Sequence, residues 1–192
     1  MPTPNPEALR FLQSRRSHPA KTLAAPAPDR AMLAPILTAA LRVPDHGKLE
    51  PWRLIVLARP ALARLAGAAD AHAAAAGMPA EQAAKGISQF AASPLCVAVV
   101  FSPKPSDKVP EVEQLLSAGA VALSLLNAAM AAGWGAAWLT GWPAYDAAFC
   151  AANLGLAAGE KVVGFVHIGT PPGPSPERPR PDPAALTTWL DA

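Results

Sequence analysis

The sequence is poor in charged residues, and this shortage limits what the protein can bind. Only 16% of its 192 residues are charged, and 16 basic against 14 acidic residues leave a net charge of +2. Such an even balance argues against nucleic-acid binding, which needs a concentrated positive surface. Because hydrophobic residues make up 52% of the chain, we also expect another subunit to cover part of its surface.

Cysteine and targeting signals are equally scarce. Cys96 and Cys150 are the two cysteines of the chain and have no metal-ligand spacing. They are interpreted as buried free thiols, with a disulfide or a catalytic nucleophile as the alternatives. The first residues, Met1 to Pro6, lack the basic start and apolar stretch of a secretory signal, so a cytoplasmic location is expected. The glycine patterns of phosphate loops and Rossmann folds are also missing, which excludes a classical dinucleotide fold.

One uncharged stretch needs a test against a membrane span. No charged residue occurs from Gln114 to Tyr145, and this length would cross a bilayer. The stretch is rich in alanine and glycine, which are weak lipid-facing residues, and it divides into a helix at 111–132 and a strand at 135–140. We therefore expect a central buried helix of a protein that does not enter the membrane.

Hydrophobic periodicity and turn residues predict helices and strands along the whole chain. The expected elements are helices at 6–16 and 29–41, a strand at 52–57, helices within 60–93, a strand at 94–101, a helix at 111–132, a strand at 135–140, a helix at 143–153 and a strand at 161–169. Pro35 should kink the second helix or delay its start. This order predicts a sheet between layers of helices, although the pattern alone leaves strand direction open.

The expected domain organisation is a single domain that spans residues 1–192. After Thr170 the chain becomes rich in proline, which prevents regular structure. Residues 171–192 are therefore predicted to form a proline-rich C-terminal extension that runs over the surface.

Two small basic clusters suggest a binding site. Arg15-Arg16-Ser17 follows the first helix, and two guanidinium groups beside a hydroxyl would suit a phosphate monoester. Arg42 and His46 would add donors if their loop folds back toward the first helix. The plainer explanation is that cations favour the C-terminal ends of helices, as in a helical interaction protein. Because charge is scarce elsewhere, the two clusters together favour an anion site.

The order of these and other short motifs points to a known family. The chain resembles the YdjA-type branch of the nitroreductase family over nearly its whole length. The motifs that carry the resemblance are Arg15-Arg16-Ser17, Arg42-Val-Pro-Asp-His46, Glu50-Pro51-Trp52, Glu113-Gln114, Ser117-Ala118-Gly119, Gly133-Trp134-Gly135, Trp138, Gly141, Lys161-Val162-Val163-Gly164-Phe165 and Gly169-Thr170-Pro171.

This resemblance implies a fold, a cofactor and a reaction. The implied fold is α+β, with a central, mainly antiparallel sheet flanked by helices, in a homodimer with a long helical interface. Two FMN molecules would lie at the subunit interface, and NADH or NADPH would reduce them. The electrons would then pass in a ping-pong reaction to a small acceptor such as a nitroaromatic or a quinone.

The resemblance also assigns roles to particular residues. Arg15, Arg16 and Ser17 would hold the phosphate and ribityl chain from one subunit. The partner would contribute Arg42 and His46, together with Trp138, Leu139 and Thr140. No catalytic side chain and no metal is implied, because the chemistry is centred on the flavin.

Three positions depart from the family pattern. Relatives carry an arginine where Leu139 stands, so Arg178 or Arg180 would have to replace that cation. Lys48 and Glu50 stand where the wider family carries asparagine and glutamine. These changes leave open an alternative, a flavin-binding or flavin-sequestering module without turnover. Whether residues 60–93 form a lid over the site is a further hypothesis.

Overall fold

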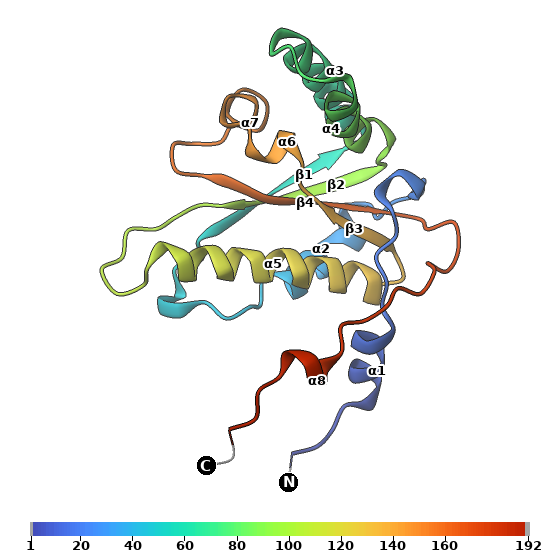
Figure 1. The fold of residues 1–192 in the computed structure, drawn as a ribbon, viewed down its shortest axis with the longest axis vertical. Coiled ribbons are helices and arrows are strands. Elements are labelled where there is room, and N and C mark those ends of the chain that lie inside the picture. Colours follow the sequence, from blue (N-terminus) through green and yellow to red (C-terminus); the bar gives the residue numbers. More distant parts are fainter. Residues whose placement is uncertain (1, 191–192) are drawn as a thin grey trace.

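A computed structural model describes residues 2–190 and shows an α+β fold around an antiparallel sheet (Figure 1). The part of the chain between residues 2 and 190 forms one four-stranded sheet in the order β1-β2-β4-β3, with every neighbouring pair antiparallel. The strands are β1 (Trp52–Ala58), β2 (Leu95–Phe101), β3 (Gly135–Leu139) and β4 (Lys161–Gly169). Each predicted strand is confirmed within one residue at either end, and the antiparallel sheet that the resemblance implied is present.

Helices cover both faces of this sheet. The helices of residues 2–190 are α1 (Pro6–Ser14), α2 (Arg30–Ala40), α3 (Arg59–Ala75), α4 (Ala80–Ala92), α5 (Glu111–Ala131), α6 (Trp142–Tyr145), α7 (Ala147–Leu154) and α8 (Pro183–Leu186), with 3-10 turns η1 (Ala20–Thr22) and η2 (His46–Lys48). Of these, α1 and α8 lie away from the sheet (Figure 1). On one face, α5 and α2 bury an aliphatic cluster against the sheet. On the other face, α3, α4 and α7 enclose a cluster that contains three phenylalanines. Cys96 and Cys150 belong to this second cluster and are buried free thiols, as expected.

Local capping decides where several helices begin and end. The Asp29 side chain accepts a hydrogen bond of 2.8 Å from the amide of Met32 and caps α2 at its expected start. Pro35 lies inside this helix, so the expectation that it would delay the helix start is wrong. The single helix expected at 143–153 is also wrong, because Asp146 separates α6 from α7. Its carboxylate caps α7 by accepting a hydrogen bond of 2.8 Å from the amide of Phe149.

Helix α5 is only half buried, which corrects the expectation of a central buried helix. Val121 and Leu125 lie on its buried side, whereas Leu116 is 69% exposed and Val112 is 61% exposed. By length and composition alone this helix could cross a membrane, but part of its apolar surface is buried inside the fold. Its buried side packs on α2 and on the sheet, so its opposite side is an apolar surface of the folded chain.

Helix α1 and the described part of the C-terminal extension lie close to each other, away from the sheet (Figure 1). No residue of α1 is buried, and its apolar residues Leu9 and Leu12 are more than half exposed. The proline-rich extension runs without regular structure as far as Asp182, as expected. The prediction fails at α8, where Pro183 occupies the first turn and Asp182 accepts a hydrogen bond from the amide of Ala184.

Candidate functional site

A large cleft lies where the chain after α1 meets β3 and the C-terminal extension. Its volume is about 1080 Å³. We call it the arginine cleft, and the side chains that define it are Arg15, Arg16, Ser17, Trp138, Leu139, Thr140, Arg178 and Arg180.

Backbone hydrogen bonds hold the basic segment beside the sheet. Helix α1 stops at Ser14 because Arg15 takes an extended backbone conformation, with φ −55° and ψ 143°. Three residues later, the amide of His18 donates a hydrogen bond of 3.1 Å to the carbonyl of Ala136 in β3. Arg15, Arg16 and Ser17 are therefore placed at the edge of the sheet by its outer strand.

Arg16 is an enclosed cation of the arginine cleft. Only 16% of its side chain is exposed, and its Nε is buried without a hydrogen-bond partner in residues 2–190. Burial lowers the pKa of Arg16 from its ordinary value, and the nearby charges of Arg180 and Arg15 lower it further. A concentration of positive charge with an unused buried donor is suited to bind an anion.

The C-terminal extension forms one wall of this cleft. The Ser175 hydroxyl donates a hydrogen bond of 3.1 Å to the carbonyl of Ser17. Arg180 donates to the carbonyl of Gln13, and Glu177 pairs with Arg16. These contacts bring Arg178 and Arg180 into the same cleft as Leu139, where the sequence predicted that one of them would replace a missing cation.

Trp138 lies against bare backbone on the neighbouring strand. Its Nε1 donates a hydrogen bond of 3.3 Å to the carbonyl of Val163. A Cβ added to Gly164 would come within 1.8 Å of that nitrogen, so the indole needs a glycine at this position. The indole remains 37% exposed and offers a flat apolar surface to the cleft. Sequence reasoning used Gly164 only as part of a family motif and missed this function.

The structure brings together only part of the predicted site. Trp138, Leu139 and Thr140 line the same cleft as Arg15, Arg16 and Ser17 of their own chain. Within one chain these three residues already lie beside the basic segment, because β3 ends next to the segment after α1. Their contribution from a partner stays a prediction.

Arg42 and His46 lie elsewhere in the chain. His46 lines a smaller cleft of about 270 Å³ with Pro44, Glu113, Leu116, Ser117 and Ala120, and Arg42 is exposed at the end of α2. Their loop packs against the first turns of α5 instead of folding back toward α1.

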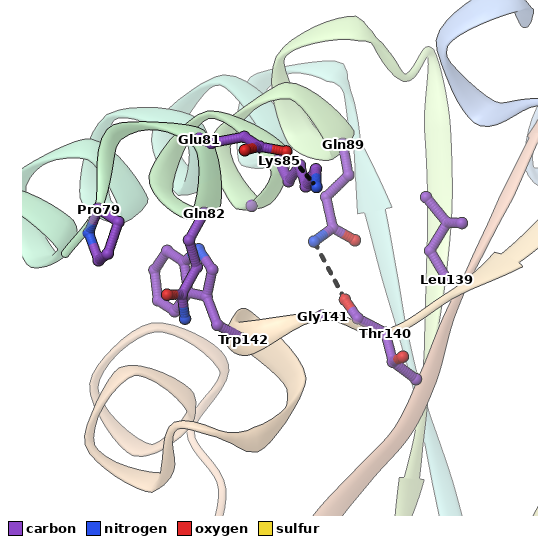
Figure 2. Close-up of a pocket in the computed structure, with 10 residues that line it drawn as sticks. Pro79, Glu81, Gln82, Lys85, Gln89, Leu139, Thr140, Gly141 and Trp142 are labelled. Carbon is purple, nitrogen blue, oxygen red and sulfur yellow. Dashed lines mark hydrogen bonds and ion pairs between the residues drawn. The ribbon is translucent and has the colours of Figure 1, made fainter.

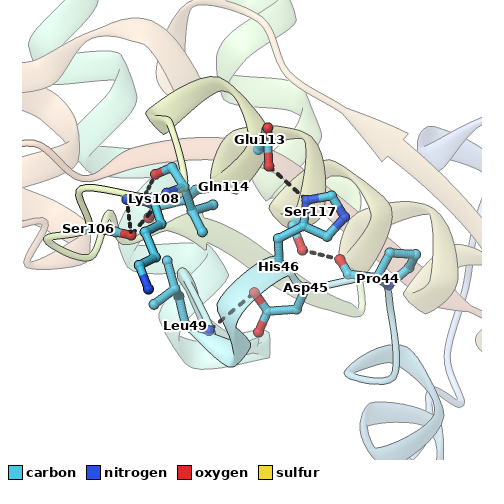
Figure 3. Close-up of polar contacts among 10 residues, drawn as sticks. Pro44, Asp45, His46, Leu49, Ser106, Lys108, Glu113, Gln114 and Ser117 are labelled. Carbon is cyan, nitrogen blue, oxygen red and sulfur yellow. Dashed lines mark hydrogen bonds and ion pairs between the residues drawn. The ribbon is translucent and has the colours of Figure 1, made fainter.

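Hydrogen bonds give residues 42–52 a defined shape (Figure 3). Asp45 accepts hydrogen bonds from the amides of Leu49 and Glu50, at 3.3 and 2.8 Å. His46 Nδ1 lies 2.7 Å from Glu113 Oε2, so the start of α5 orients the imidazole. Lys48 and Glu50 have φ values of 54° and 48°, a left-handed conformation that is costly for residues with a side chain. The two departures from the family pattern are thus located in a tightly constrained turn.

A third concave site lies between α4 and the end of β3 (Figure 2). This Gln89 pocket has a volume of about 580 Å³, and its lining residues are Pro79, Glu81, Gln82, Lys85, Gly86, Gln89, Leu139, Thr140, Gly141 and Trp142. It shares Leu139 and Thr140 with the arginine cleft. Helix α4 comes from the stretch 60–93 that was considered as a lid, and it forms one wall of this pocket. Gln89 was not identified from the sequence, because an isolated glutamine in an alanine-rich helix carries no signal.

Comparison with known proteins identifies the family. The model of the nitroreductase family matches residues 12–170 of the chain. The Escherichia coli (strain K12) protein named "Putative NAD(P)H nitroreductase YdjA" is 35% identical over 189 residues, which cover 96% of this chain and 100% of that protein. This chain belongs to the nitroreductase family.

Solved structures share the fold over nearly the full length. A nitroreductase-like family protein from Bacillus cereus has a TM-score of 0.79 and 22% identity, covering 100% of both chains. A structure from Desulfovibrio desulfuricans, described as a "putative nitroreductase in complex with fmn", has a TM-score of 0.71 and 23% identity and covers 98% of both chains. At these identities the likeness concerns the fold alone.

Proposed function

We propose that this chain is an FMN-dependent NAD(P)H oxidoreductase whose arginine cleft holds the phosphate of FMN. The observation that carries the proposal is Arg16, whose buried Nε has no partner within residues 2–190 and whose neighbours are Arg15 and Arg180. A phosphate monoester carries nearly two negative charges and several acceptor oxygens, which matches such a cluster. The name of the Escherichia coli relative and the FMN complex of the Desulfovibrio neighbour support the same assignment.

Each wall of the cleft has a distinct part in this proposal. Arg15, Arg16 and Ser17 bind the phosphate and ribityl chain, and Arg178 or Arg180 supplies the positive charge that Leu139 lacks. Trp138, Leu139 and Thr140 form the apolar and backbone contacts of the ring system. When bound, FMN accepts two electrons from NADH or NADPH and passes them in a second half-reaction to a small acceptor such as a nitroaromatic or a quinone.

A homodimer would complete the site. The exposed apolar side of α5 includes Leu116, which lines the same small cleft as His46. Pairing two such surfaces about a two-fold axis would bury them and carry Arg42 and His46 toward the partner's arginine cleft. A cation beside the ring would stabilise the negative charge that it gains on reduction. Glu113 would act as a positioning residue, because it holds His46 from one side.

The first test is the visible spectrum of the purified protein and its response to reductant. We expect flavin absorption at one FMN per chain, and anaerobic NADPH or NADH should bleach it. Flavin bands that persist would favour the sequestering module. A colourless protein that takes up no FMN on reconstitution would overturn the proposal.

A pair of arginine variants tests the cleft itself. Arg16→Ala should weaken FMN binding at least about tenfold, because one charge-assisted hydrogen bond is worth about 1.5–3 kcal/mol. Arg10→Ala is the matched control, since Arg10 is exposed on α1 and does not line the cleft. Fluorescence titration of the apoprotein with FMN measures both affinities. Equal affinities in the two variants would contradict the assignment of the phosphate site.

A further inference from the structure

The Gln89 pocket contains a polar group that the folded chain does not satisfy. Gln89 is 7% exposed, and its Nε2 donates a hydrogen bond of 3.2 Å to the carbonyl of Thr140. The bond fixes the orientation of the amide, because only its nitrogen can face a carbonyl oxygen. Its Oε1 is buried and has no hydrogen-bond partner among residues 2–190. A buried acceptor without a hydrogen-bond partner lowers the stability of the fold by about 1–3 kcal/mol.

The Gln89 side chain forms part of the wall of this pocket, with its Oε1 covered by neighbouring atoms. The Gln89 side chain extends from α4 into the space between that helix and the end of β3 (Figure 2). Gly141 adds no side chain, and its φ of 79° lets the backbone turn sharply into α6. The pocket is therefore open between Gln89 and the β3 end, and the volume of about 580 Å³ lies in the usual range of small-molecule sites.

The walls of the pocket select a flat apolar molecule. The Trp142 indole packs directly on α4 because Gly86 has no side chain. A Cβ added to Gly86 would lie 2.0 Å from the indole Nε1. On its other side, the ring of His72 stacks on this indole at 5.4 Å with a 10° angle between the planes. Pro79 and Leu139 add further apolar walls. The two charges of the pocket, Lys85 and Glu81, pair with each other at 2.7 Å on the exposed side of α4.

We infer that the Gln89 pocket binds a small neutral aromatic molecule with one hydrogen-bond donor, of the phenol or aromatic-amine class. Its O–H or N–H donates to Gln89 Oε1 after a small shift of the side chain uncovers that atom. The apolar walls provide the binding surface, and the unpartnered amide oxygen provides the selection for a donor. The mutual pairing of Lys85 and Glu81 leaves no free charge for an ionic ligand. The inference does not rest on the FMN assignment, and the two sites adjoin each other at Leu139 and Thr140.

A pair of fluorinated probes tests the donor requirement. 4-Fluorophenol carries the O–H, whereas 4-fluorotoluene has nearly the same shape and lacks it. Titrations followed by ¹⁹F NMR should show that the phenol binds about tenfold more tightly, which corresponds to one hydrogen bond to an otherwise unsatisfied acceptor. Gln89→Met should bring the ratio of the two affinities close to one. Equal binding of both probes by the unaltered protein, or no binding of either, would refute the inference.

Two further variants locate the probe without changing Gln89. Gln82 is exposed on α4 and lines the pocket, so Gln82→Trp should fill it and abolish the binding of both probes. Ala84 is exposed on the same helix and does not line the pocket, so Ala84→Trp should bind both probes normally. FMN content should be the same in both variants, which separates this test from that of the arginine cleft. Unchanged probe binding in Gln82→Trp would place the probes elsewhere and overturn the inference.

Discussion

At the scale of single residues, His167 shows the cost of a polar group inside the sheet. It lies in β4 between Cys96 of β2 and Ala137 of β3, and its side chain is fully buried. Neither ring nitrogen has a hydrogen-bond partner among residues 2–190. Burial lowers the pKa of His167 to about 4, because the charged imidazolium cannot be solvated there.

This histidine should make the protein sensitive to mild acid. The unfolded chain binds a proton at the ordinary pKa of about 6.5, whereas folded His167 resists protonation until the pH approaches 4. The contribution of neutral His167 to the free energy of unfolding is therefore fully present above pH 6.5 and is lost as the pH falls toward 4. The free energy of unfolding should fall less between pH 7 and pH 4.5 in His167→Leu than in the unaltered protein, by about 2 kcal/mol. Urea unfolding at both pH values measures the difference, and an unchanged loss in the variant would show that His167 is not responsible.

The residues that were predictable from the sequence are those whose side chains carry chemistry. Arg15 and Arg16 attract notice in any chain that is poor in charge, and the structure places both in the arginine cleft. Gln89 and Gly164 were missed for a physical reason. A glutamine becomes informative only when its burial is known, and a glycine only when Trp138 is found to lie on it.

At the scale of elements, the contact between β3 and β4 controls one wall of the arginine cleft. Gly164→Ala would place a methyl group where the Trp138 indole now lies. We expect a loss of about 1–3 kcal/mol from overpacking, together with a displaced indole and weaker FMN binding. Gly67→Ala in α3 is the control, because a Cβ there meets nothing within 4 Å and alanine favours a helix by up to about 1 kcal/mol.

Thermal unfolding and tryptophan fluorescence of the apoprotein separate these two glycine variants. Gly164→Ala should lower the melting temperature and change the emission, whereas Gly67→Ala should leave the emission unchanged and unfold at the same or a higher temperature. Two variants with indistinguishable spectra would mean that the position of the Trp138 indole does not depend on Gly164.

Helices and strands were predicted well where their hydrophobic periodicity is strong. They were predicted less well where a single polar side chain decides where a helix begins. The four strands were found because apolar runs between turn residues are distinctive. The break between α6 and α7 was missed because Asp146 acts as a cap, which a window average does not detect. The half-exposed state of α5 was missed because small and apolar residues occur on both of its sides. An apolar surface for a partner and an apolar surface for the core have the same composition.

At the scale of the whole molecule, the exposed apolar surfaces share one explanation. Helix α1 has no buried residue, and α5 exposes Val112, Leu115, Leu116 and Leu123. Both belong to a chain in which only 16% of residues are charged. A monomer rarely leaves such surfaces in contact with water. Association of two copies through α5, with α1 and the C-terminal extension reaching the partner, would bury these surfaces and place His46 at the interface.

If the proposed homodimer forms through α5, a charge on this helix should separate its subunits and release the proposed cofactor together. Leu116 is 69% exposed and adjoins His46 in the small cleft, so Leu116→Glu should put an unpaired carboxylate into the interface without disturbing the core. We expect sedimentation as a monomer and an FMN content well below one per chain. Ala84→Glu provides the control, because Ala84 is exposed on α4, across the sheet from α5, and should leave a dimer with full FMN. A Leu116→Glu protein that remains a dimer would exclude α5 as the interface. A monomer that still holds one FMN would show that the arginine cleft of a single chain is sufficient for the cofactor.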